Sequence, residues 1–137
     1  MKKFGSVAAV LAVVVAVTGT LLAADLTVKD VMKKAHAGPN SLLANIGKDL
    51  KDEDPDWSDI QKETKELVDL VTALGKNDPP KGDKESWQTM TKAYLDKVKA
   101  LDAAAQKKDK ATAQSSHAKL KDSCNACHKA HNPNPDK

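Results

Sequence analysis

Apolar side chains recur at steps of three and four residues in four stretches of this chain. These stretches span residues 27–50, 57–74, 86–105 and 111–131. Such spacing predicts amphipathic helices, each with one apolar stripe facing the interior. No alternating run rich in Val, Ile and Thr lies between turn signals, so strands are not expected. Four helices joined by short polar connections favour an all-α fold, with an antiparallel up-down four-helix bundle as the natural packing.

Local signals mark where the predicted helices begin and end. Thr27 to Asp30 has the form of a capping box, which would start the first helix. Gly38 and Pro39 interrupt the apolar pattern of that helix, and proline lacks the N–H that a helix interior requires. We therefore expect a kink or a short break there rather than a domain boundary. Gly75 is a plausible stop for the second helix.

The N-terminus has the composition of a secretory signal. Two lysines follow Met1, and an apolar run covers 7–23 before Ala24. This order predicts a signal peptide at 1–24 and a mature domain at 25–137, exported across the inner membrane to the periplasm. The alternative is an uncleaved segment that anchors the domain to the membrane, facing the periplasm, although the run is short for a span of about 20 residues.

The composition of the chain narrows the choice of partners and describes its core. All 22 basic residues are lysines, and the charges nearly cancel once the two N-terminal lysines are removed. No basic patch indicates nucleic acid as a partner. The predicted mature domain holds three aromatic residues, Trp57, Trp87 and Tyr94. A core with so few large side chains leaves room for a large planar cofactor.

The last stretch contains the motif Cys124-Asn-Ala-Cys127-His128, with both cysteines of the chain, and three chemistries compete for it. A disulfide-exchange pair normally lies beside a strand, whereas this pair comes late in a helix of an all-helical chain. A zinc site would still lack a ligand. Covalent attachment of haem c uses two thiols for the haem vinyl groups and the adjacent histidine for the iron, and the predicted export favours it. On a helix the three side chains lie within about one turn.

A four-helix bundle with its haem motif on the last helix resembles the class II cytochromes c, the family of the cytochromes c′ and their low-spin relatives of the c-556 type. The resemblance rests on "CNACHKAH" at 124–131 and on its place in the chain. Together with "VMKKAH" at 31–36, this motif is also similar to secreted haem proteins of planctomycete-type bacteria. The resemblance implies one covalent haem c between the first and last helices. It also implies thioether bonds at Cys124 and Cys127 and His128 as the proximal iron ligand.

The resemblance assigns the sixth iron position to the first helix. The family's distal residue lies about two and a half turns into that helix, which falls on His36 in this chain, so His128 and His36 are the expected iron ligands. Met32 lies one turn earlier and is the alternative distal ligand, and an open site is the third possibility. His117 lies about 16 Å along the helix from His128 and is expected to be structural or exposed. His131 is expected at the haem edge or near a propionate.

These features predict a periplasmic electron carrier with one low-spin, six-coordinate haem c and no enzymatic activity. Its partners would be other redox proteins, met in transient contacts, with membrane contact only if the N-terminal segment is uncleaved. A homodimer is also compatible with the resemblance, since class II relatives often pair through their first two helices. The alternative function is that of a cytochrome c′-like protein that binds or senses NO or CO at an open or displaceable distal site.

Overall fold

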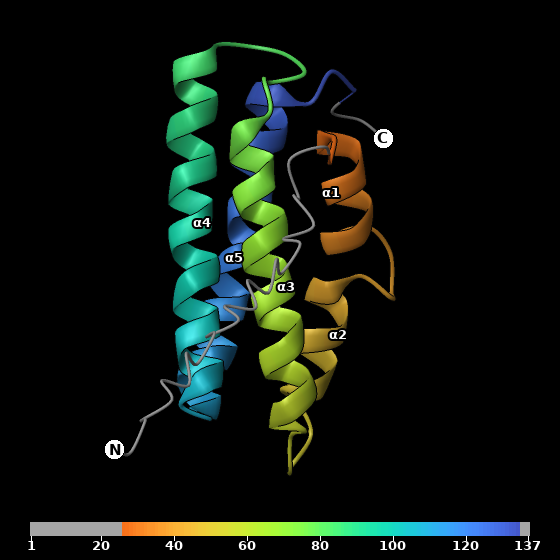
Figure 1. The fold of residues 1–137 in the computed structure, drawn as a ribbon, viewed down its shortest axis with the longest axis vertical. Helices are drawn as coiled ribbons and strands as arrows, with labels where there is room; N and C mark the ends of the chain where they lie inside the picture. Colours follow the sequence, from red (N-terminus) through yellow and green to blue (C-terminus); the bar gives the residue numbers. More distant parts are fainter. Residues whose placement is uncertain (1–25, 135–137) are drawn as a thin grey trace, which may run out of the picture.

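The computed structural model describes residues 26–134, which form five α-helices (Figure 1). They are α1 (Val28–Ala35), α2 (Leu42–Asp49), α3 (Trp57–Lys76), α4 (Lys84–Gln106) and α5 (Lys110–His131). No strand occurs within residues 26–134, so the expected all-α class is confirmed. None of the helices in this range is both long enough and apolar enough to cross a bilayer. The predicted signal peptide and its cleavage point lie outside the described residues.

Three long helices and two short ones are arranged around one core. The long helices α3, α4 and α5 run side by side, and α4 packs against both of the others (Figure 1). The short helices α1 and α2 follow one another along α3, and α2 also reaches α5. No Cα atom of α1 lies within 8 Å of a Cα atom of α5. The first and last helices are therefore not packed directly on each other.

The first predicted helix is broken into α1 and α2 by residues 36–41, as its sequence suggested. Gly38 has a φ of +83°, a backbone conformation that favours glycine, and Pro39 follows it. The Ser41 hydroxyl then accepts a backbone N–H and so starts α2. The capping box at the start of α1 is also present, because Thr27 and Asp30 each accept the other's backbone N–H. The expected break is confirmed, and its causes are local.

The end of α3 differs from the sequence prediction, because the helix passes through Gly75 and ends at Lys76. Gly75 is an interior position of the helix that faces α4. A Cβ atom there would lie 3.5 Å from Thr91 Oγ1, which is an ordinary van der Waals contact. Asn77 closes the helix, and its Nδ2 donates to the carbonyl oxygen of Ala73 at 2.9 Å. The prediction that Gly75 ends this helix was therefore wrong.

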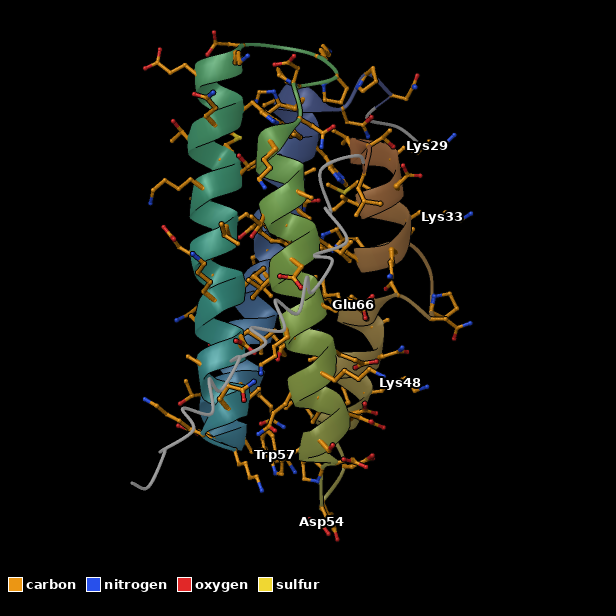
Figure 2. All side chains as sticks on the ribbon, viewed as in Figure 1. Lys29, Lys33, Lys48, Asp54, Trp57 and Glu66 are labelled. Atoms are coloured by element: carbon orange, nitrogen blue, oxygen red, sulfur yellow. The ribbon has the colours of Figure 1, made fainter. Side chains whose placement is uncertain are left out.

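The apolar stripes of all five helices meet in a shared core. Its most deeply buried side chains, each 0% exposed, include Val31, Ile46, Ile60, Leu67, Val98, Leu101 and Leu120. Burying an aliphatic side chain of this size stabilises the fold by about 1.5–3 kcal/mol. Charged side chains lie on the outside, and Figure 2 shows Lys29, Lys33 and Lys48 pointing away from the core. The fold therefore has its apolar stripes in the interior and its charged side chains at the surface.

Candidate functional site

Two cavities with a shared wall lie between α1 and α5. Their volumes are about 180 and 560 Å³. Both are lined by Met32 and His36 from the α1 side and by Cys127 and His128 from α5. The smaller cavity extends along α4 to Tyr94, and the larger one extends to the residues that follow α5. The structure thus brings the predicted proximal and distal residues, which are distant in sequence, to one space.

The two cysteines lie one helical turn apart near the end of α5, and both thiols are free and half-buried. Cys124 Sγ donates to the carbonyl oxygen of Leu120 at 3.5 Å. Burial raises the pKa of both thiols, and the neighbouring Cys124 raises that of Cys127 further. Both thiols are therefore protonated at neutral pH. A disulfide-exchange pair normally has the opposite property, a cysteine whose pKa is lowered.

His128 follows Cys127 on α5 and is exposed at the border of both cavities. Its backbone carbonyl accepts the N–H of Asn132 at 2.9 Å, which closes the last turn of the helix. The backbone of the motif is therefore helical throughout, and the side chains of residues 124, 127 and 128 lie within about one turn. This is the arrangement that the sequence predicts for the motif.

His36 is the capping residue that follows α1, and its half-buried ring lies against Tyr94 of α4. Its backbone N–H donates to the carbonyl oxygen of Met32 at 3.0 Å. Its Nε2 lies 3.4 Å from Tyr94 Oη, and the two rings meet edge to face with centroids 5.6 Å apart. Burial, and secondly the nearby charge of His128, lowers the pKa of His36 to about 4. The imidazole is therefore neutral at pH 7, the form that has a lone pair for a metal ion.

Met32 lies one turn before His36 on α1 and lines both cavities as well. Its side chain is half-buried and packs against the core cluster. A flexible thioether in such a place fills space in many proteins, and it is also a haem ligand in cytochromes. Both distal candidates thus reach the same space, and the preference for His36 over Met32 stays a prediction.

The remaining two histidines have contacts of their own. His117 Nε2 donates to the carbonyl oxygen of Leu43 at 2.7 Å, and this bond ties α5 to α2, away from both cavities. His131 is buried: its Nδ1 donates to the carbonyl oxygen of Lys81 at 2.8 Å, and its Nε2 lies 3.2 Å from Ser86 Oγ. His131 also lines the larger cavity, edge-on to Trp87. It therefore fastens the loop between α3 and α4 to the end of α5.

The wall contributed by α4 was not anticipated from the sequence. Met90, Tyr94 and Lys97 line the smaller cavity, and Lys97 Nζ donates to Ser123 Oγ at 2.5 Å, next to Cys124. Burial raises the pKa of the Tyr94 phenol, so its O–H group is kept at neutral pH. The sequence pattern placed Tyr94 on the apolar stripe of its helix, but a stripe does not say which of its members faces a cavity.

The residues around the two cavities fit a haem better than a zinc ion. Within the described residues, no group of three or more His, Cys, Asp or Glu side chains is arranged to hold a metal ion, as zinc would require. A haem iron needs one or two protein ligands, since the porphyrin supplies the others. His36 Nδ1 is buried and has no hydrogen-bond partner in the described part of the chain. The cavity wall therefore contains a polar atom whose hydrogen-bonding capacity is unsatisfied. The two thiols, the adjacent histidine and the mostly apolar walls complete the fit.

Comparison with known proteins found no match for this chain among family models, curated proteins or solved structures. The likeness to class II cytochromes c therefore stays a prediction from the motif and its position. Any statement about function depends on the geometry between α1 and α5.

Proposed function

We propose that this protein is a mono-haem c-type cytochrome of the periplasm, an electron carrier without enzymatic activity. In this proposal the fold is an antiparallel four-helix bundle in which α1 and α2 together serve as the first helix. One observation carries the proposal: Met32 and His36 line the same two cavities as Cys127 and His128. Two thiols, a histidine beside them and two candidate sixth ligands thus surround one space, which a zinc or disulfide site would not require.

The haem motif supplies the attachment and the first axial ligand. When bound, haem c provides an iron that alternates between Fe(II) and Fe(III). Cys124 and Cys127 would hold the group through two thioether bonds, each made when a thiol adds across a vinyl double bond and its hydrogen goes to the other vinyl carbon. His128 offers a ring nitrogen as the proximal ligand. The protonated state of both thiols before attachment is compatible with this addition, which consumes the hydrogen.

The α1 wall supplies the second axial ligand, and His36 is the preferred candidate. Its imidazole is neutral at pH 7 because burial holds its pKa at about 4, so one ring nitrogen carries a lone pair, and Nε2 can bind a metal when the hydrogen is on Nδ1. Ligation by two histidines gives a lower reduction potential than ligation by His and Met. Met32 remains the alternative ligand from the same wall.

Electron transfer to other redox proteins suits the surroundings of this site. His128 lies within α5 and His36 caps α1, and both already line the same cavities, so they reach the iron with little rearrangement of the chain. Lys29 lines the larger cavity and, with Lys33, points outward from α1 (Figure 2). These positive charges would steer an acidic redox partner toward the haem, and added salt would weaken that attraction. The carrier would work in the periplasm, either free or anchored through an uncleaved N-terminal segment.

A second candidate function is binding or sensing of NO or CO, as in cytochromes c′. It is favoured by the position of His36, which lies outside regular helix at the start of the break at 36–41. A ligand on such a segment is easier to displace than one in the middle of a helix. In this case a small diatomic molecule would replace the distal side chain.

Absorption spectra of the protein, exported and matured with its haem, test the proposal. The pyridine haemochrome spectrum should be that of a haem with two thioether bonds, and the ferric protein should be low-spin. His36→Ala should convert the iron to a high-spin form that binds CO readily, whereas Met32→Ala should stay low-spin. His117→Ala is the matched control and should leave every spectrum unchanged. Loss of the low-spin features in the Met32 variant alone would refute His36 as the ligand.

A further inference from the structure

The hydroxyl of Tyr94 contacts Nε2 of His36, the ring nitrogen that would bind the iron. Tyr94 Oη lies 3.4 Å from His36 Nε2, a contact slightly longer than the usual hydrogen bond. If the phenol donates, it uses the lone pair of Nε2; if Nε2 carries the hydrogen, it has no lone pair to offer. In either tautomer, Nε2 cannot bind a metal ion while this contact lasts.

The other nitrogen of the ring is poorly placed to bind in its stead. His36 Nδ1 is buried in protein and has no hydrogen-bond partner within residues 26–134. An iron that approached Nδ1 would have to displace the atoms that enclose it. Nε2 is therefore the nitrogen for which the phenol and the iron compete.

The backbone around His36 allows the ring to move between two partners. His36 ends α1, and the next regular residue is Leu42, so one side of the residue is not held by a helix. Gly38, with its φ of +83°, lies within this connection. Tyr94 is held in the middle of α4, a helix of 23 residues, whereas His36 stands at the end of a helix of eight residues.

We propose that Tyr94 is a positioning residue that competes with the iron for His36 Nε2, so that the sixth position exchanges between His36 and a small neutral ligand. This inference rests on the proposed function, since it needs a haem between α1 and α5. Tyr94 weakens the hold of His36 on the iron without touching the iron itself. The same protein is thereby kept ready to bind a diatomic molecule such as CO.

Titration of the ferrous protein with CO, in the wild type and in Tyr94→Phe, tests this inference. CO binds only the fraction of molecules whose sixth position is open, so its apparent Kd rises as His36 binds more firmly. Removing one competing hydrogen bond should raise that Kd about 2- to 10-fold. Ser86→Ala is the matched control, because it removes another hydroxyl next to a histidine, His131, and Ser86 itself lines neither cavity. Its Kd for CO should equal that of the wild type.

A second background shows whether the effect passes through His36. In His36→Ala, the further change Tyr94→Phe should leave the Kd for CO unchanged. The inference is overturned if Tyr94→Phe lowers the Kd or leaves it unaltered, or if its effect persists without His36. A lower Kd would mean that Tyr94 supports ligation, through Nδ1. A wild type that carries no haem would instead refute the proposed function, which the pyridine haemochrome spectrum shows before any titration.

Discussion

Replacing Gly47 in α2 by alanine tests how tightly the last helix is fastened to the second. A Cβ atom at Gly47 would lie 2.6 Å from Cε1 and 2.8 Å from Nε2 of His117 on α5. Real Cβ contacts are not this short, so the imidazole must move. The movement breaks the hydrogen bond of 2.7 Å from His117 Nε2 to the carbonyl oxygen of Leu43. An ordinarily favourable change, glycine to alanine inside a helix, thus becomes unfavourable at this position.

Three terms set the size of the effect. Crowding a packed contact costs about 1–3 kcal/mol. Loss of the hydrogen bond costs about 1 kcal/mol more. Alanine returns about 1 kcal/mol through its higher helix propensity. We therefore expect Gly47→Ala to lower the free energy of unfolding by about 1–3 kcal/mol. In a His117→Ala background the ring is absent, and the same change should raise the free energy of unfolding by about 0.5–1 kcal/mol.

The assay is urea unfolding of the four proteins that make up this cycle, followed by far-ultraviolet circular dichroism. The two single variants, the double variant and the wild type share all other residues, so the sign of the Gly47→Ala effect is compared directly. Equal effects of Gly47→Ala in both backgrounds would refute the contact between Gly47 and His117. His117→Ala should also leave the haem spectra unchanged, because His117 lines neither cavity.

Three further predictions concern the motif, a partly buried carboxyl group and the bond between α4 and the end of α3. Cys127→Ala should leave the haem with one thioether bond, seen as a pyridine haemochrome spectrum shifted from that of the wild type. Burial raises the pKa of Glu63 above its ordinary value of 4.5, so the folded state holds this proton more tightly than the unfolded state. Its contribution to stability is therefore lost as pH rises through the raised pKa. As pH rises from 4 to 7, the urea midpoint of the Glu63→Gln variant should increase relative to the midpoint of the wild type. Trp87→Phe removes the bond of 2.8 Å from the indole N–H to the carbonyl oxygen of Asn77 and should cost about 1–3 kcal/mol, measured by thermal unfolding.

The helices were predictable because their signals are local. The capping box at Thr27 and the interruption at Gly38 and Pro39 act through neighbouring residues alone, and the structure has both. Gly75 was misjudged as a stop because α3 continues through it to Lys76. Asn77 caps the helix, and its Nδ2 donates to the carbonyl oxygen of Ala73, a contact that a glycine stop signal does not contain.

The candidate site was predictable in its motif and less so in its walls. Cys124, Cys127 and His128 stand together because one helix carries them, so their spacing was sufficient. The position of His36 opposite them follows from the order of the helices. Tyr94 was missed as a cavity residue, because the rotation of α4 about its axis depends on packing against both α3 and α5. The all-α class could thus be predicted from the spacing of apolar residues. The residues that surround the predicted distal position could be identified only in the structure.

The mass of the intact exported protein, measured under denaturing conditions, tests the central claim most directly. Covalent attachment through Cys124 and Cys127 predicts one species, the mature chain plus one haem, with neither thiol open to alkylation. A folded, all-helical protein with the mass of the bare chain and two alkylated cysteines would contradict the account.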